Sequence, residues 1–217
     1  QLVAEIAAAA RPGAERVLDT CAAPGGKTAI LAERLPAAQI TAVDASRRRL
    51  QEMQRILAPA LRNAIQFEVA DAAKIRLQPD YGLILCDVPC SGTGTMARNP
   101  EIRLRIEEAE LKRQQARQIG IVRASVAGLV AGGTLVYSTC SLEPEENEDV
   151  VDRVLRGTSG LRVVPVAEIL DELLAMRVVT SSGRELLRTA TDGAYLRTIP
   201  GVLPCDGFFA AVLEKSS

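Results

Sequence analysis

The stretch RVLDTCAAPGGKTAILAERL, Arg16 to Leu35, decides the fold class of this chain. It begins with a short apolar run that reads as a buried strand ending in an acid, passes through a turn of small residues, and then becomes helical. Gly25 and Gly26 let another group approach the backbone of the turn, and the start of the helix offers free N–H groups. A strand followed directly by such a turn and a helix is the unit from which doubly wound sheets are built.

The same unit recurs in the residues that follow. QITAVDAS predicts a second strand that ends in Asp44, with Ser46 as the N-cap of the next helix. IQFEVADA and YGLILCDVPC predict a third and a fourth strand, which end at Asp71 and Asp87. This alternation predicts a doubly wound, mainly parallel sheet, in which ligands bind outside the carboxyl ends of the strands. We therefore expect the residues that follow these strand ends to converge on one edge.

The second half of the chain continues the alternation. Apolar positions from Glu107 to Val130 recur at helical spacing, which predicts one long amphipathic helix that the following AGG sequence closes. GTLVYST predicts a fifth strand, and Pro144 with Glu145 and Glu146 predicts the first turn of another helix, whose dipole favours those acids. AYLRTIP and GFFAAVLEK read as two final strands, and their link is too short for a crossover helix. That pair is expected to be antiparallel.

Composition narrows the class of protein. The chain has 217 residues, of which 47% are apolar and 24% charged, so we expect one soluble domain with a substantial core. No apolar segment approaches the ~20 residues of a membrane span and no signal sequence starts the chain, which predicts a cytoplasmic protein without a membrane partner. The formal net charge of -1 predicts no strong overall attraction to nucleic acid, although local patches are compatible with it. The chain starts at Gln1 in what reads as a helix already under way, consistent with an N-terminal domain that these residues lack.

Five cysteines and the lack of histidine constrain the chemistry. An odd number of cysteines argues against a disulfide framework, and a cytosolic setting keeps thiols reduced. Without histidine, mixed Cys/His zinc sites and Ser-His or Cys-His catalytic pairs are excluded. Acid–base chemistry must then use Asp, Glu, Cys, Lys or Tyr.

The turn CAAPGGKT fits neither the spacing of a P-loop nor the GxGxxG dinucleotide pattern. Asp44 nonetheless lies about 20 residues beyond its glycines, where an acid at the end of a second strand suits ribose hydroxyls. We infer an adenosine-containing cofactor, with Arg49 close enough to steady Asp44, and with Asp71 either contacting the adenine amino group or capping the next turn. The alternative is a glycine turn needed only for packing, beside a solvated helix face that carries Arg47, Arg48 and Arg49.

Two cysteines follow strand ends. Cys90 in DVPCSGTG is preceded by a proline and followed by a flexible loop, and Cys140 lies in STCS after the fifth strand. Cys86 reads as core, Cys21 as packing or backbone contact, and Cys205 as a residue without a partner. A four-cysteine metal site, a redox pair, and a nucleophile with a partner thiol are the three interpretations. The strand position of Cys86 argues against the metal site, and the missing CxxC spacing argues against the redox pair.

Taken in order, the motifs CAAPGGKT, VDAS, VADA, DVPCSGTGTMARNPEIR, STCSLEPEENEDVV and DGFFAAVLEK resemble those of the Sun/Nop family of RNA cytosine-5 methyltransferases. The resemblance runs from about Val17 to Lys215 and is greatest to bacterial RsmB-type enzymes, which methylate small-subunit ribosomal RNA. It implies a Rossmann-like α/β methyltransferase fold, with a mainly parallel seven-stranded sheet and an antiparallel C-terminal strand pair. It also implies that residues 1–217 form a catalytic domain without the family's N-terminal RNA-binding domain, that S-adenosylmethionine is the cofactor, and that ribosomal RNA is the substrate.

The roles that the resemblance implies agree with the chemistry of cytosine. Carbon 5 is too weak a nucleophile to take a methyl group unaided, so a thiolate, here Cys140, adds to carbon 6. Asp87 hydrogen-bonds or protonates ring nitrogen 3 as the thiolate adds, and Cys90 assists the release of the product. No metal is implied. The matching motifs give the cofactor site as Cys21, Ala22, Ala23, Pro24, Gly25, Gly26, Lys27, Asp44, Arg49, Asp71 and Asp87.

The target base must be unstacked or presented in a single-stranded loop. Basic residues after the PC motif either line an RNA groove or form a solvated helix face; they are Arg98, Arg103, Arg105, Lys112 and Arg113. Four other functions are alternatives to a ribosomal RNA cytosine-5 methyltransferase. These are a transfer RNA cytosine-5 methyltransferase, a DNA cytosine-5 methyltransferase with Cys90 as its nucleophile, a non-catalytic RNA-binding assembly factor with the same fold, and a nicotinamide-dependent dehydrogenase.

Overall fold

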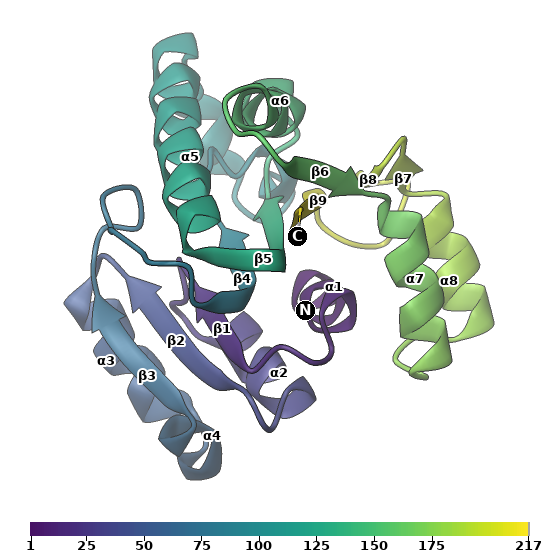
Figure 1. Cartoon of the computed structure of the whole chain (residues 1–217). Helices are drawn as coiled ribbons and strands as arrows, with labels where there is room; N and C mark the ends of the chain where they lie inside the picture. The colour runs from purple at the N-terminus through teal and green to yellow at the C-terminus, as the bar shows by residue number, and fades with distance from the viewer. Residues whose placement is uncertain (217) are drawn as a thin grey trace.

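A nine-stranded mixed sheet forms the centre of the molecule, in the order β3-β2-β1-β4-β5-β9-β8-β7, with β6 pairing to β9 off this path (Figure 1). The computed structural model describes residues 1–216. The strands are β1 (Arg16–Asp19), β2 (Gln39–Asp44), β3 (Ile65–Val69), β4 (Tyr81–Asp87), β5 (Leu129–Thr139), β6 (Leu161–Val164), β7 (Thr191–Asp192), β8 (Tyr195–Thr198) and β9 (Phe208–Lys215).

The first five strands are parallel and the remainder of the sheet is antiparallel. β1 pairs with β2 on one side and β4 on the other, so the direction of winding reverses between β1 and β4. Such a switch point leaves a crevice at the carboxyl ends of the strands, which is where ligands bind in this class of fold. The predicted doubly wound α/β fold is therefore confirmed.

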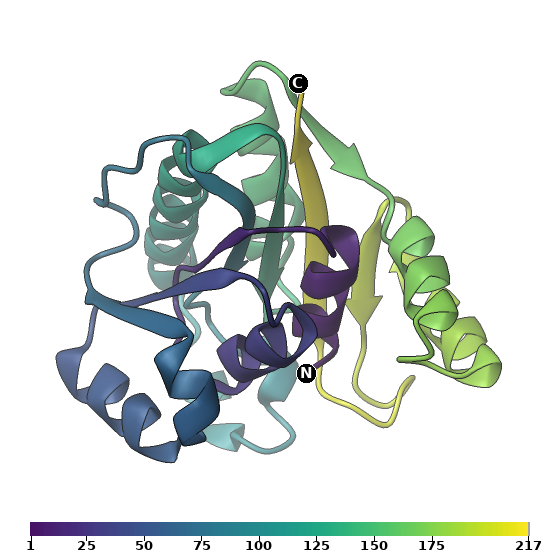
Figure 2. The same cartoon turned by 60° about the horizontal axis from the view of Figure 1, so that its bottom comes forward.

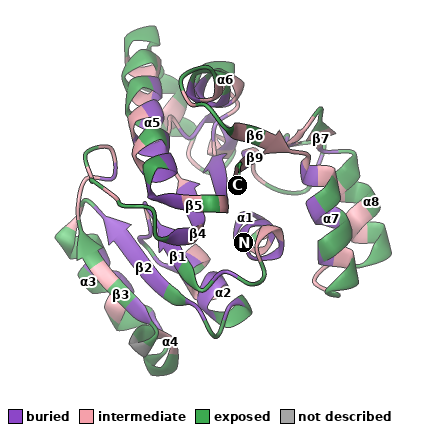
Figure 3. Cartoon of the chain, viewed as in Figure 1, coloured by how far each residue is buried: buried purple, intermediate pink, exposed green. Residues whose placement is uncertain are grey.

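Helices cover both faces of this sheet. The apolar side chains of α1, α2, α3 and α7 pack on one face, and those of α5 and α6 on the other, so that the sheet is buried between them (Figures 1 and 3). The helices are α1 (Leu2–Ala10), α2 (Gly26–Arg34), α3 (Arg47–Ile56), α4 (Pro59–Asn63), α5 (Glu108–Gly128), α6 (Glu148–Arg156), α7 (Val166–Ala175) and α8 (Ser181–Arg188), with the short 3-10 turns η1 (Thr93–Thr95), η2 (Pro100–Leu104) and η3 (Pro144–Glu146).

Several predicted boundaries are confirmed. Ser46 caps α3 by accepting a hydrogen bond from the Arg49 backbone N–H. β4 ends at Asp87 as expected, and β8 pairs with β9 in the antiparallel sense. β3 ends at Val69, two residues before the predicted acid, so Asp71 lies in the loop that follows and does not close the strand.

Two predictions about the second half are wrong. The AGG sequence does not close a helix: α5 ends at Gly128 and β5 begins at Leu129, so these residues lie inside the strand. The reason is a bulge, because the register against β4 shifts between Tyr81 and Leu83 and Gly132 adopts a positive φ of 70°. The sheet also has nine strands where seven were expected, since the short β6 and β7 extend the antiparallel group.

β9 occupies an interior position in the sheet. It pairs antiparallel with β5 along six residue pairs, from Thr134 opposite Glu214 to Thr139 opposite Phe209, and with both β8 and β6. Figure 2 shows β9 as the long yellow strand between the parallel strands and the α7–α8 pair. Among residues 1–216, no helix has the length and apolarity that crossing a membrane requires.

Candidate active site

The carboxyl ends of β4 and β5 bring the two predicted reactive loops together. These strands are parallel neighbours, with Cys86 opposite Tyr137 and Asp87 opposite Ser138. The Ser138 hydroxyl donates a 2.7 Å hydrogen bond to Asp87 Oδ1 across the strand pair. The loops that leave the two strands carry Cys90 and Cys140, so register alone places both thiols beside one carboxylate.

The thiols of Cys90 and Cys140 are in contact, with 3.3 Å between their Sγ atoms. The hydrogen bond between them lowers the pKa of Cys140 and raises that of Cys90, and burial raises the pKa of Cys90 further. Charged neighbours act on both thiols: Asp87 raises the pKa of Cys140 and Lys27 lowers it, whereas Glu146 raises the pKa of Cys90. Cys140 is therefore the thiol that ionises first, with Cys90 as its hydrogen-bond donor.

Lys27 and Asp87 form an ion pair next to these thiols. The distance from Lys27 Nζ to Asp87 Oδ2 is 2.6 Å, and each side chain is about a quarter exposed. Lys27 comes from the first turn of α2, so the glycine turn after β1 delivers a cation to the end of β4. With Ser138 on Oδ1 and Lys27 on Oδ2, Asp87 is fixed in orientation and has a proton donor at contact distance.

Glu146 holds the Cys90 loop in place. Its side chain is fully buried and accepts hydrogen bonds from the Ser91 backbone N–H at 2.9 Å and from Gln118 Nε2 at 3.0 Å, and the Ser91 hydroxyl also donates to it. Gln118 donates to the carbonyl of Pro89 as well, at 3.0 Å. The sequence interpretation, which gave Glu146 to the helix dipole, missed this role. Nothing in a run of acids distinguishes the one that turns inward.

The Cys140 loop is held by a second buried set of polar groups. Thr139 Oγ1 donates to Asn147 Oδ1 at 2.6 Å, and Asn147 Nδ2 donates to the Ser141 carbonyl at 3.0 Å. The Gly94 N–H donates to the Cys140 carbonyl at 2.9 Å, which ties the two cysteine loops to each other. Both loops are thus fixed by residues of the stretch 144–147, which follows Cys140 in sequence.

The residues predicted to bind ribose lie between β1, β2 and α3. Asp44 is 5% exposed, and its carboxylate accepts hydrogen bonds from the backbone N–H groups of Ser46 at 2.8 Å and Ala23 at 3.3 Å. Arg49 pairs with Asp44 at 3.2 Å and also donates to the Ala23 carbonyl. A cavity of 280 Å³ lies here, and Cys21, Asp44, Arg49 and Asp71 are among its lining residues. Asp44, Arg49 and Asp71, which the sequence analysis assigned to one site, therefore line the same cavity.

A smaller hollow of 150 Å³ lies beside it, against the glycine turn. It is lined by seven residues of the predicted set, together with Gln1 and Asp19; the seven are Cys21, Ala22, Ala23, Pro24, Gly26, Lys27 and Asp87. Gly25 has φ +106°, and a Cβ on Gly26 would meet nothing within 4 Å, so the first turn of α2 presents bare backbone to the hollow. All the predicted cofactor residues except Gly25 line one of the two cavities.

Asp19 is a further acid that the site predictions did not include. Thr28 donates to its Oδ2 at 2.7 Å, whereas its Oδ1 is buried without a hydrogen-bond partner in the part of the chain that the structure describes. Burial raises the pKa of this carboxyl to about 7. The sequence did contain a signal for this role. Asp19 ends the strand β1, just as Asp44 and Asp87 end the neighbouring strands β2 and β4 at the same edge of the sheet.

The other cysteines lie as predicted or carry no assigned role. Cys86 is fully buried in the core, donates to Ser125 Oγ at 3.2 Å, and has a pKa raised to about 11 by burial. Burial also raises the pKa of Cys21, which disfavours it as a nucleophile. Cys205 is exposed. Within residues 1–216, no cluster of three or more Cys, Asp or Glu side chains is arranged to hold a metal ion.

Comparison with known proteins relates this site to RNA-modifying enzymes. A family model described as 16S rRNA methyltransferase RsmB/F matches residues 7–214. A ribosomal RNA small subunit methyltransferase B from Xanthomonas campestris is 35% identical over 208 residues, covering 94% of this chain and 44% of that protein. A tRNA (cytosine(34)-C(5))-methyltransferase from Drosophila melanogaster is 31% identical, covering 93% of this chain and 34% of that protein.

The fold of this chain is similar to that of a solved structure. NSun6 from Pyrococcus horikoshii, crystallised with SFG, an analogue of S-adenosylmethionine, superposes with a TM-score of 0.73 and 25% identity. The match covers 99% of this chain and 52% of that one. The chain thus spans less than half the length of the two curated relatives and about half of the solved structure.

Proposed function

Because the chain belongs to the RsmB/F family of 16S rRNA methyltransferases, we propose that it forms the catalytic domain of an enzyme that methylates carbon 5 of a cytosine in RNA. The observation that carries this proposal is the contact between the sulfur atoms of Cys90 and Cys140, beside the Lys27–Asp87 pair. A DNA enzyme with Cys90 as its nucleophile is disfavoured, since the matching family and the curated relatives are named as RNA methyltransferases.

The residues at the strand ends fit S-adenosylmethionine. Asp44 is oriented by two backbone N–H groups and an arginine, which suits a carboxylate that accepts from ribose hydroxyls. The unpartnered Oδ1 of Asp19 and the bare backbone at Gly26 suit the amino and carboxylate ends of the methionine part. When bound, this cofactor supplies a methyl group activated on a sulfonium. A nicotinamide cofactor has no comparable support, because the turn lacks the GxGxxG pattern.

The first step that we assign to the protein is activation of the base by Cys140. Its thiolate adds to carbon 6, and a new S–C bond forms while the electron pair of the C5–C6 double bond moves toward carbon 5 and ring nitrogen 3. Asp87 passes a proton to nitrogen 3 as this charge develops, and the Lys27 ammonium, 2.6 Å from Asp87 Oδ2, supplies that proton to the carboxylate. Carbon 5 then has the enamine character that lets it accept a methyl group.

Release of the product is assigned to Cys90. While Cys140 is a thiolate, the hydrogen bond between the two thiols is the largest cause of the raised pKa of Cys90. Addition of Cys140 to the base consumes that thiolate, so Cys90 can lose its proton to solvent and act as a base. It then removes the proton from carbon 5, and the electron pair of that C–H bond restores the C5–C6 double bond. The S–C bond breaks with its electrons returning to the Cys140 sulfur, and nitrogen 3 gives its proton back through Asp87 to Lys27.

Small-subunit ribosomal RNA is the substrate that we propose first, because the family and its bacterial member from Xanthomonas campestris are named for it. Such a reaction takes place in the cytoplasm, on a cytosine that is unstacked or single-stranded. Transfer RNA is the second candidate, and the Drosophila melanogaster relative is the observation in its favour. Mapping bisulfite-resistant cytosines in both RNAs, from cells with and without the protein, decides between them.

Incubation of the Cys140→Ala and Cys90→Ala variants with S-adenosylmethionine and RNA tests the mechanism. We expect no methylation by Cys140→Ala, and a covalent protein–RNA adduct that persists with Cys90→Ala and survives denaturing electrophoresis. The reverse pattern would overturn the assignment of the two thiols. Calorimetry that shows RNA binding but no binding of S-adenosylmethionine would favour a non-catalytic assembly factor with this fold.

A further inference from the structure

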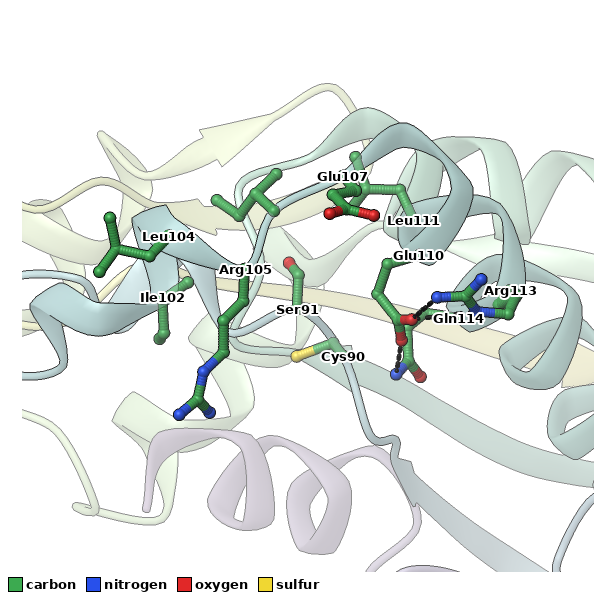
Figure 4. Close-up of a pocket in the computed structure, with 11 residues that line it drawn as sticks. Cys90, Ser91, Ile102, Leu104, Arg105, Glu107, Glu110, Leu111, Arg113 and Gln114 are labelled. Carbon is green, nitrogen blue, oxygen red and sulfur yellow. Dashed lines mark hydrogen bonds and ion pairs between the residues drawn. The ribbon is translucent and has the colours of Figure 1, made fainter.

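A larger cavity opens on another side of Cys90. Its volume is 610 Å³, within the range of about 300–1,000 Å³ typical of ligand pockets. Cys90 and Ser91 line it, but none of Lys27, Asp87 and Cys140 does, so it is distinct from the two cavities at the cofactor turn (Figure 4). Figure 4 shows its walls coming from η2, from the start of α5 and from the loop between them.

One wall of this cavity is aliphatic and unusually exposed. Ile102, Leu104, Ile106 and Leu111 line it, and Leu104 is 79% exposed. Exposed apolar side chains that gather beside a reactive residue indicate a surface that is covered when a ligand binds. The chain has no tryptophan and only 3% aromatic residues, so aliphatic side chains must take the place of the aromatic platforms on which bases usually stack.

Arg105 brings a positive charge to the same cavity. Of the basic residues that follow the PC motif, Arg98 pairs with Asp206, Lys112 with Glu108 and Arg113 with Glu110. Arg105 lines the cavity and has no acidic partner among the described residues. Figure 4 shows it among the residues that surround the same cavity as Cys90. An unpaired guanidinium at the edge of an apolar cleft suits a phosphate.

Gln114 adds an unsatisfied acceptor on the opposite side. Its Nε2 donates to Glu110 at 2.9 Å, and its Oε1 is buried without a partner in the described chain. A carboxylate only accepts from an amide, so Glu110 fixes the amide with its oxygen turned away. Arg113 forms an ion pair with Glu110 and so balances its charge. Glu107 lines the same end of the cavity and adds a negative charge, which disfavours an anion there. A neutral N–H donor therefore suits the Gln114 end, and an anion suits the Arg105 end.

Resting on the function proposed above, we propose that this cavity binds an unpaired nucleotide next to the target cytosine in the RNA. Its phosphate contacts Arg105, its base lies against the aliphatic wall formed by Ile102, Leu104, Ile106 and Leu111, and an N–H group of the base donates to Gln114 Oε1. Cys90 borders both this cavity and the thiol pair, so a nucleotide held here is one step along the strand from the base at Cys140. The cavity thereby keeps the target base out of its stack.

The test compares the binding of single-stranded RNA oligomers by the wild-type chain and three variants, with fluorescence anisotropy as the readout. The oligomers contain one cytosine, and each neighbouring nucleotide is either intact or abasic. Arg105→Ala is expected to bind about 5- to 10-fold more weakly whether or not the base is present, and to lower the slope of log affinity against log salt by about 0.7. Arg103→Ala is the matched control, since Arg103 is exposed on the same segment but does not line the cavity.

Gln114→Leu gives the sharper result. It is expected to weaken binding about 3- to 10-fold for the intact oligomer and to have no effect when the neighbouring base is missing, because the bond it removes goes to that base. Equal affinities for wild type, Arg105→Ala and Gln114→Leu, or losses no larger than with Arg103→Ala, would overturn the proposal. RNA binding without methylation by the wild type would overturn the proposed function but not the cavity, and the lack of any RNA binding at low salt would overturn both.

Discussion

At the scale of single residues, the two thiols have the same chemistry but different surroundings. Cys140 lies near both Asp87 and Lys27, whereas Cys90 precedes Ser91, whose N–H and hydroxyl donate to the buried Glu146. The hydrogen bond between the sulfurs then transmits this asymmetry, because the thiol that keeps its proton stabilises the thiolate of the other. The order of ionisation therefore depends first on a contact between two residues that are 50 positions apart in the sequence.

Alkylation of Cys140 tests this order. The folded state lowers the pKa of Cys140, so its thiolate persists to lower pH than an ordinary cysteine allows. Cys90→Ala removes the largest cause, and the rate of alkylation by iodoacetamide is expected to rise with pH at a higher midpoint than in the wild type. Peptide mass spectrometry across pH 6 to 10 measures it, with Cys205→Ala as the control at an exposed thiol. An unchanged midpoint would contradict the pairing.

At the scale of elements, the reactive loops are held by the segment between β5 and α6. Glu146 fixes the loop after β4, and Asn147 fixes the loop after β5, so one short turn sets the relative position of both cysteines. Close backbone packing reinforces it: a Cβ on Gly94 would come within 2.3 Å of the Gly207 carbonyl oxygen, so only glycine fits there. The link from β8 to β9 is thereby part of the same assembly.

Glu146→Gln is predicted to impair catalysis through this assembly. An amide cannot accept from Ser91 and Gln118 with both of its heteroatoms, so one donor loses its partner, at a cost of about 1–3 kcal/mol in unfolding free energy. Displacement of Cys90 is expected to lower kcat about 10- to 100-fold while KM for S-adenosylmethionine stays near the wild-type value. Steady-state methylation assays and urea denaturation give both quantities.

Glu145→Gln provides the matched control for that prediction. Glu145 is the preceding residue, its side chain is exposed, and the change removes the same charge. Equal kinetics for the two variants would show that charge in the 3-10 turn, and not the hydrogen bonds to Ser91 and Gln118, determines the effect.

The sequence was sufficient for the parallel half of the sheet and for most of the site, for identifiable reasons. Each of Asp44, Asp87 and Cys140 follows an apolar run at a strand end, and parallel strands bring such ends together. The positions of Glu146 against Ser91 and of Gln114 on the cavity beside Cys90 could not be predicted, because they depend on tertiary contacts that no local pattern encodes. The prediction that Ala131–Gly133 ends a helix was wrong for a similar reason. Glycine is common both at helix ends and at β-bulges, and only the pairing of β5 with β4 distinguishes the two.

At the scale of the whole molecule, the burial of Asp19 links stability to pH. The pKa of its carboxyl is about 7 in the folded chain, above the ordinary value of 3.8. Its contribution to stability is therefore fully present below pH 3.8 and is lost as pH rises through about 7. Asp19→Asn keeps a hydrogen-bond acceptor for Thr28 but does not ionise.

We predict that Asp19→Asn gains stability relative to the wild type as pH rises from 4 to 7. The difference in unfolding free energy is expected to grow by up to about 4 kcal/mol over this range, at about 1.4 kcal/mol per pKa unit. Urea denaturation at half-unit pH steps measures it, with the exposed Asp152→Asn as the control. A constant difference across the range would show that Asp19 is ionised in the folded chain.

The interior position of β9 has a consequence for synthesis of the protein on the ribosome. β1 to β5 can pair with one another as they emerge, but β6 and β8 attach to the sheet only through β9, and β7 only through β8. The nascent chain must therefore hold an open edge along β5 for the several seconds in which the residues up to 215 are translated. An unpaired strand edge invites pairing with other chains, so translation speed and chaperone cover over this interval govern the yield of native protein.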